Sequence, residues 1–311
     1  MMIRPLAQGD PRSLGCYRVL GVLGSGGMGR VLLGLGPDGR AVAIRQIRGS
    51  LGDDGYRARL RHEATARMRV SGTFTAPVID FDIDAQDPWL ASIFVVGIPL
   101  GKAVAEAGPL PVAALAALAS ALAGALRDIH AAGLVHGNLE PAKVMLTARG
   151  ARVIDSGIAS LSADPAGSTE TGTALGSAAY LSPERASGEA ATTAGDIFSL
   201  GSLLAMAATG SSPFAASSLA YTRFQIMHTE PDLAKVPHEA RELIAACLRK
   251  DPGSRPTAAQ LLYSLGELPG GTAPWPARLH TGLRGQERQL ALLTDRRTKN
   301  SAPQPPPPCI H

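Results

Sequence analysis

The sequence predicts an α+β fold with two lobes: a small antiparallel β-sheet with one helix, followed by a larger, mainly helical lobe. Two observations support this. Across residues 17–96, apolar residues fall in short β-rich runs broken by Gly, Pro and Asp, as in YRVLGVLG and RVLLGLG. Across residues 97–268, long Ala/Leu-rich segments have the length and periodicity of helices. At 311 residues and 45% hydrophobic content, the chain can bury a large core.

The N-terminal lobe is expected to contain a hairpin and a helix. Pro37-Asp38-Gly39 has turn chemistry, so Arg30–Leu35 and Arg40–Ile47 are predicted to pair as antiparallel strands. An Arg-rich helix is predicted from Tyr56 to about Val70, with Glu63 near its middle. The lobe is thus a small sheet with one helix.

The C-terminal lobe is expected to be built from long helices. Three segments have helical length and periodicity: Val112–Ala132, Ala194–Thr209 and Pro237–Leu248. The last helix should stop at Gly266, because glycine tolerates the left-handed conformation of a helix exit.

Two flanking segments lie outside the lobes. Residues 1–16 form an N-terminal extension, and residues 269–311 form a Gly/Pro-rich tail. A short helix is predicted over 285–293 in this tail, whereas the Pro-rich run 301–308 should be extended or disordered. We interpret the Pro-rich run as a spacer in preference to a ligand for an aromatic groove.

Composition argues against several classes of protein. The net charge is +4, but basic residues are scattered, so nucleic acid is not an expected partner. Cys16, Cys247 and Cys309 lack metal-ligand spacing and are odd in number, which favours reduced thiols in a cytoplasmic protein. The N-terminus has no apolar signal region. The run Val112–Leu126 is shorter than the ~20 residues of a membrane span, so none is expected.

A glycine-rich segment follows the first predicted strand. Gly24 to Val31, GSGGMGRV, matches the pattern G-x-G-x-x-G-x-V. Dinucleotide-binding folds share the first six positions, but their glycines open a helix. Here the glycines lead into RVLLGLG and a hairpin, which favours a flap folded over phosphates.

Further motifs occur in a fixed order along the chain. They are Ala43-Ile44-Arg45, Glu63, HGNLEPAK from His136 to Lys143, Asp155-Ser156-Gly157, Ser182-Pro183-Glu184, Asp196 in AGDIFSLG and Arg255 in DPGSRP. In this order they resemble the Hanks-type serine/threonine protein kinases of actinobacteria, over residues 17–268. The resemblance implies a protein-kinase fold and transfer of the γ-phosphate of ATP to protein, with Mg²⁺ or Mn²⁺ as cofactor.

The phosphate-binding position departs from this family. Arg45 stands where the family has a Lys that holds the α- and β-phosphates, and Glu63 stands where its helix Glu holds that Lys. A guanidinium is a wide planar fork that tends to pair bidentately with a carboxylate. We expect an Arg45–Glu63 pair that closes the lobe yet misplaces the nucleotide, the alternative being a tolerated conservative exchange.

The catalytic loop departs further. Asn138 replaces the acceptor-orienting Asp, so it can hydrogen-bond a hydroxyl but cannot take its proton. Glu140 occupies the place of a family Lys that meets the transferred phosphate, which a carboxylate would repel. Lys143 replaces a metal-binding Asn; its ammonium has no lone pair for Mg²⁺, though its charge partly stands in for the metal. Asp155 keeps one carboxylate, so at most one metal site is expected.

Two exchanges affect regulation. Ser156 removes the Phe whose packing helps set the active arrangement, and Gly137 removes an Arg that pairs with a phosphorylated activation loop in many relatives. Four hydroxyls are candidate phosphate acceptors, although a solvated loop is the preferred interpretation: Thr169, Thr171, Thr173 and Ser177.

Other positions match the scaffold of the family. Glu184 and Arg255 match a structural ion pair, Asp196 matches a residue that braces the catalytic loop, and His136 is expected to be a packed histidine. The expected ATP-binding residues are Leu23, Gly24, Gly26, Gly29, Val31, Ala43, Arg45, Glu63, Ile93, Val95 and Met145. The apolar members among them are interpreted equally well as core side chains of strands.

The sequence therefore favours a degenerate kinase, or pseudokinase, that acts in signalling by binding ATP weakly or by binding an unidentified signalling protein. Two alternatives stay open. One is a slow but active serine/threonine kinase with a protein acceptor, and the other is a scaffold that binds no nucleotide.

Overall fold

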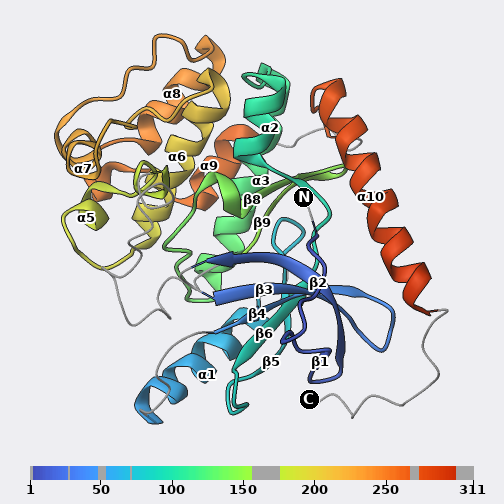
Figure 1. Cartoon of the computed structure of the whole chain (residues 1–311). Coiled ribbons are helices and arrows are strands. Elements are labelled where there is room, and N and C mark those ends of the chain that lie inside the picture. Colours follow the sequence, from blue (N-terminus) through green and yellow to red (C-terminus); the bar gives the residue numbers. More distant parts are fainter. Residues whose placement is uncertain are drawn as a thin grey trace. The chain divides into compact units, whose positions relative to one another are not determined.

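The computed structural model describes residues 3–26, 29–47, 54–70, 72–155, 176–266 and 273–298. The chain divides into two compact units. The first unit contains residues 1–71, 76–96 and 282–311, and the second contains residues 72–75 and 97–281. The first is built on an antiparallel sheet and the second is mainly helical, so the predicted α+β class is confirmed (Figure 1).

The first unit is organised by a six-stranded antiparallel sheet of order β1-β2-β3-β4-β6-β5. Its strands are β1 Ser13–Leu14, β2 Tyr17–Gly26, β3 Gly29–Leu35, β4 Ala41–Gln46, β5 Val78–Asp82 and β6 Trp89–Ile93. The predicted hairpin is confirmed, because β3 and β4 pair from Val31 with Arg45 to Leu35 with Ala41. Gly39 supplies the positive φ of 78° that the intervening turn requires.

Apolar side chains cover both faces of this sheet. Successive residues of a strand point to opposite faces, so β4 directs Val42 and Ile44 to one face and Ala43 and Arg45 to the other. Val42 and Ile44 belong to a buried cluster with Cys16, Tyr17, Val19, Val22, Leu32, Trp89 and Ala91. A second buried cluster contains Leu20, Leu33 and Leu35.

Helix α1, Asp54–Met68, accompanies the sheet, close to the predicted bounds. It contacts β5, and Leu60 and Ala64 on one of its faces are fully buried. This spacing of four residues is that of a single helix face. Arg67, one turn after Glu63, is also buried.

Helix α10, Ala277–Thr298, is much longer than the predicted segment 285–293. Within the first unit, Leu290 and Leu293 pack against the Leu20–Leu33–Leu35 cluster. Each interior glycine costs a helix roughly 1 kcal/mol relative to alanine, so Gly282 and Gly285 favour a shorter helix when the sequence is considered alone. Burial of Leu279 and Leu283, on either side of Gly282, offsets that cost.

The second unit is a helical assembly with a small sheet of order β7-β8-β9. Its strands are β7 Ile98–Pro99, β8 Val144–Thr147 and β9 Gly150–Val153. Its helices are α2 Leu100–Ala107, α3 Val112–Ala131, α5 Pro183–Ala186, α6 Thr193–Thr209, α7 Leu219–His228, α8 His238–Cys247 and α9 Ala258–Leu265, with short 3₁₀ turns at Pro141–Lys143 and Pro252–Ser254.

Helices α3 and α6 form the buried centre of the second unit. Helix α3 confirms the predicted helix Val112–Ala132 to within one residue. Its apolar part is longer than the predicted run Val112–Leu126, so by length and composition alone the helix could cross a membrane. Its apolar window is 67% buried, as in the core helix of a globular domain. Helix α9 has a capping box between Thr257 and Gln260 and ends at Gly266 with φ 68°, which confirms the predicted helix exit.

The cysteines differ from the expectation of reduced thiols. Cys16, in the buried cluster of the first unit, is disulfide-bonded, so the expectation is wrong for this residue. Cys247 is a free buried thiol, and burial raises its pKa to about 12. Cys309 lies outside the described residues.

Candidate functional site

The glycine-rich segment lies at the end of a β-hairpin in the first unit. Gly24 pairs with Val31 and Gly26 pairs with Gly29 across β2 and β3. Gly29 has φ 115°, a conformation that residues with a Cβ rarely adopt. Strand rather than helix follows the glycines, as the predicted phosphate flap requires, while Gly27 and Met28 lie outside the described residues.

Three predicted nucleotide-binding residues share one face of the sheet. Val31 lies directly opposite Arg45, and Ala43 is two residues before Arg45 on β4. All three are partly buried. Ser92 of β6 lies opposite Ala43.

The remaining predicted residues are distributed between the two units. Leu23 is partly buried on β2, and Val95 is buried after β6. The Ile93 N–H donates to the Pro77 carbonyl at 3.1 Å, so this backbone donor already has an intramolecular acceptor. Met145 is buried on β8 of the second unit.

Glu63 of α1 has a partner that the sequence interpretation missed. Arg67 Nη2 donates to Glu63 Oε2 at 3.0 Å, with only 2% of the Arg67 side chain and 18% of the Glu63 side chain exposed. The two residues are four apart in the helix, a spacing that places side chains side by side. The spacing of four residues could have indicated this pair from the sequence. It could not have indicated that the arginine is buried. The pairing of Arg45 with Glu63 stays a prediction.

Asp196 fixes the catalytic loop in the second unit. Its carboxylate accepts from the His136 N–H at 2.8 Å and from the Gly137 N–H at 2.8 Å, and it lies 2.8 Å from His130 Nε2. The predicted bracing role is therefore confirmed. His136 is buried, and burial lowers its pKa, as expected of a packed structural histidine.

Gly137 and Asn138 begin the altered part of the loop. Gly137 has φ 72°, and a Cβ there would lie 3.2 Å from the Ala191 Cβ, so the backbone conformation suits glycine. Asn138 lines a small surface cleft together with Tyr180, Arg185 and other residues. The loop thus presents an amide, and not a carboxylate, to this cleft.

Lys143 and Asp155 form an ion pair. Lys143 Nζ lies 2.9 Å from Asp155 Oδ2, with 12% and 20% of the side chains exposed. Lys143 directly precedes β8 and Asp155 follows β9; Val144 pairs with Val153, and the Ile154 N–H donates to the Lys143 carbonyl at 2.9 Å. The antiparallel register therefore brings the ammonium to the carboxylate.

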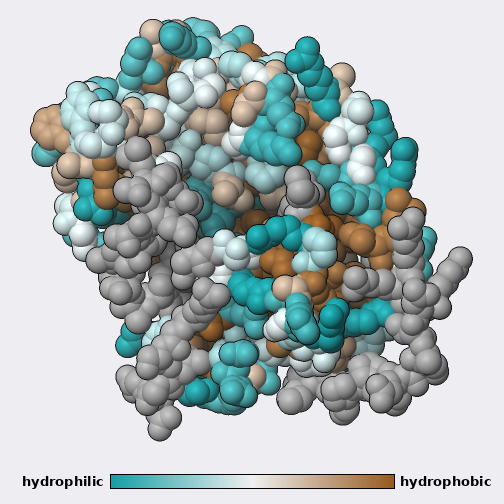
Figure 2. Space-filling view, in the orientation of Figure 1, coloured by the Kyte–Doolittle hydropathy of each residue, from teal (hydrophilic) through white to brown (hydrophobic). Residues whose placement is uncertain are grey.

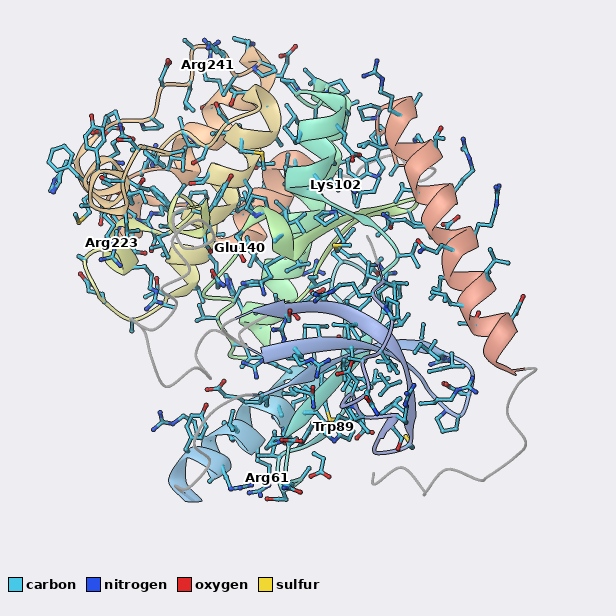
Figure 3. All side chains as sticks on the ribbon, in the orientation of Figure 1. Arg61, Trp89, Lys102, Glu140, Arg223 and Arg241 are labelled. Atoms are coloured by element: carbon cyan, nitrogen blue, oxygen red, sulfur yellow. The ribbon has the colours of Figure 1, made fainter. Side chains whose placement is uncertain are left out.

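Glu140 also has a partner from the same unit. The Ser177 hydroxyl donates to Glu140 Oε2 across 37 residues of chain. Burial, with a contribution from Glu140, raises the pKa of Tyr180 to about 12. Figure 3 labels Glu140 beside the loop that precedes β8. Its carboxylate therefore anchors the segment that carries Ser177.

The predicted structural ion pair is confirmed. Arg255 donates from Nη1 and Nη2 to the two Glu184 oxygens at 2.9 and 3.0 Å, and both side chains are buried. Burial raises the pKa of Glu184, but hydrogen bonds from Arg255, Ser182 and the backbone, together with the charge of Arg255, outweigh burial and hold the pKa below its usual value. Further parts of the sequence interpretation lie outside the described residues, namely Ser156, Gly157, Thr169, Thr171, Thr173 and the Pro-rich run 301–308.

Comparison with known proteins assigns the family. The model of the family described as "Protein kinase domain" matches residues 17–264. The chain belongs to the protein kinase family. It is 42% identical over 308 residues to a "Probable serine/threonine-protein kinase PkwA" from Thermomonospora curvata, covering 99% of this chain and 41% of that protein. It is also 41% identical to "Serine/threonine-protein kinase AfsK" from Streptomyces coelicolor, covering 98% of this chain and 38% of that protein.

These relatives confirm the resemblance to bacterial serine/threonine kinases, and this kinase-family chain spans about two fifths of their length. A solved structure, "Crystal structure of Rad53 1-466 in complex with AMP-PNP", matches with a TM-score of 0.64 and 23% sequence identity. The match covers 79% of this chain and 64% of that one. At this identity the likeness concerns the fold, which is the bilobal protein-kinase fold.

Proposed function

We propose that this chain is a serine/threonine protein kinase homologue with impaired phosphotransfer, acting in signalling by binding ATP or a protein partner. The observation that carries the proposal is the state of the catalytic loop. Asp196 holds its backbone as the family requires, yet the loop presents Asn138 at the acceptor-orienting position. An amide cannot accept the proton of the attacking hydroxyl or stabilise it by negative charge.

Two further contacts support the proposal. Lys143 is engaged by Asp155, and Glu140 is engaged by Ser177, so both altered loop residues have partners within the protein. Neither arrangement supplies what the family uses for transfer, namely a metal-binding Asn at position 143 and a Lys at position 140. We therefore expect this chain to bind ATP more weakly than an active kinase does.

A slow but active kinase is a second candidate, favoured by the relatives, which are described as serine/threonine kinases. Phosphoryl transfer depends largely on positioning and electrostatic stabilisation, which a well-braced loop retains in part. The Asn138→Asp variant separates the candidates. An impaired enzyme should gain transfer when this carboxylate returns, whereas an enzyme that works through rearranged residues should not.

A transfer assay tests the proposed function. The chain is incubated with radiolabelled ATP, general protein acceptors, and Mg²⁺ or Mn²⁺. The proposal expects transfer near background. Robust transfer that Arg45→Ala abolishes would overturn it, because that result would show a working phosphate site. A nucleotide-free scaffold is recognised by the absence of any ATP-dependent thermal shift.

A further inference from the structure

The cation nearest to Asp155 in the second unit is supplied by the chain itself. The Lys143 ammonium is 2.9 Å from the carboxylate, and both groups are largely shielded from water. The pairing of β8 with β9 fixes the two backbones on either side of this contact. Asp155 has φ 56°, in the left-handed region, so its orientation is set by a constrained backbone.

These atoms do not suit a divalent cation. Mg²⁺ requires near-octahedral oxygen ligands, whereas an ammonium offers three donors and no lone pair. A metal approaching Asp155 would also meet the positive charge of Lys143. Within the ranges that the structure describes, no group of three or more His, Cys, Asp or Glu side chains is placed to hold a metal ion.

We infer that Lys143 takes the place of the divalent cation, so that the second unit binds the phosphates of a nucleotide through an ammonium anchored by Asp155, without Mg²⁺ or Mn²⁺. This rests on the proposed function, because it requires that a nucleotide binds. It also revises the expectation of one metal at Asp155. The nucleotide should then bind equally well with or without a metal ion on its phosphates.

The charges define what such a site would do. A carboxylate with a bound divalent cation leaves one net positive charge to attract phosphate, whereas a carboxylate with an ammonium leaves none. Binding should therefore be weaker than in a metal-using relative. It should also be insensitive to chelators, since the cation is covalently attached to the chain.

The experiment is a calorimetric titration of ATP into the full chain, in EDTA and in excess Mg²⁺. For the wild type, the two dissociation constants should agree within about threefold. Lys143→Asn places an amide oxygen beside Asp155 in place of the ammonium, so Mg²⁺ should tighten ATP binding of this variant by about tenfold or more. The matched control is Lys102→Asn, at an exposed helix pair with Glu106 in α2, which should behave as the wild type (Figure 3).

A second variant keeps the test independent of Lys143→Asn. Asp155→Asn removes the negative charge and leaves the ammonium, so ATP affinity in EDTA should stay constant or rise. If Asp155 were a metal ligand, Asp155→Asn would instead weaken ATP binding in Mg²⁺. Wild-type binding that tightens tenfold on addition of Mg²⁺, or no ATP binding in either buffer, would overturn the inference. The proposed function is tested separately by the transfer assay, in which robust phosphotransfer would overturn it.

Discussion

The Glu63–Arg67 pair yields a prediction that distinguishes a structural ion pair from a purely nucleotide-handling glutamate. Arg67 is 2% exposed, so Glu63→Gln leaves a buried guanidinium without its carboxylate. Removing one partner of a buried pair costs about 3 kcal/mol or more, because the remaining charge stays desolvated. At the ~2–4 °C per kcal/mol typical of domains of this size, the melting temperature should fall by roughly 6–12 °C.

Tryptophan fluorescence can follow this loss in the first unit. The chain has two tryptophans: Trp89 lies in the buried cluster of the first unit, and Trp275 belongs to the second. In a Trp275→Phe background, urea unfolding followed at Trp89 therefore reports the unit that contains α1. Trp275 Nε1 donates to the Thr147 carbonyl at 2.7 Å, and Trp275→Phe removes this hydrogen bond. The stability of each further variant is therefore compared with that of the Trp275→Phe protein.

The matched control removes a carboxylate from an exposed pair of the same unit. Asp84 pairs with Arg61 of α1 at 2.6 Å, with 68% and 48% of the side chains exposed (Figure 3). Asp84→Asn should cost less than about 1 kcal/mol. Adding Arg67→Met to Glu63→Gln should restore most of the lost stability. A cost for Glu63→Gln no larger than that of Asp84→Asn would refute the reasoning.

Three further outcomes are expected. Ser177→Asp places like charge against Glu140, so limited proteolysis should cut the segment around residue 177 faster than in Ser177→Asn; equal rates would contradict the anchor. Burial and a pKa near 12 should protect native Cys247 from thiol reagents at mildly alkaline pH, with rapid reaction only after unfolding. Arg255→Met should cost about 3 kcal/mol above neutral pH in denaturant titrations, and the wild type should lose that stabilisation as pH falls through the lowered pKa of Glu184.

The scaffold was largely predictable from sequence because its signals are local or belong to an ordered set of motifs. Turn chemistry at Pro37-Asp38-Gly39 predicted the hairpin, and the glycine at 266 predicted the helix exit. Asp196 and the Glu184–Arg255 pair were identified from their places in the motif order. Each of these depends on few neighbours, so side-chain packing did not alter it.

The internal contacts of the altered loop residues were not predictable. The Lys143–Asp155 contact requires the register of β8 and β9, and the Ser177–Glu140 bond joins residues 37 apart. The burial of Arg67 depends on how α1 packs. It could not be predicted from residue type, because arginines are mostly exposed. In each case tertiary structure decides which partner a charged group meets.

The length of α10 was likewise not predictable from local sequence. Buried Leu279 and Leu283 lie in the turns that the helix has in addition to the predicted segment 285–293, before Gly285. Figure 2 shows hydrophilic residues over several parts of the visible face. Local propensity thus located the helix, and packing set its bounds.

The central claim is that a well-braced kinase loop has lost phosphate transfer through its exchanged residues. It is tested most directly by comparing the wild type with the double variant Asn138→Asp/Lys143→Asn, which returns both positions to the family residues. Transfer of radiolabelled γ-phosphate to protein in Mg²⁺ should be near background for the wild type and clearly higher for the double variant. Wild-type transfer equal to or faster than that of the double variant would contradict the account.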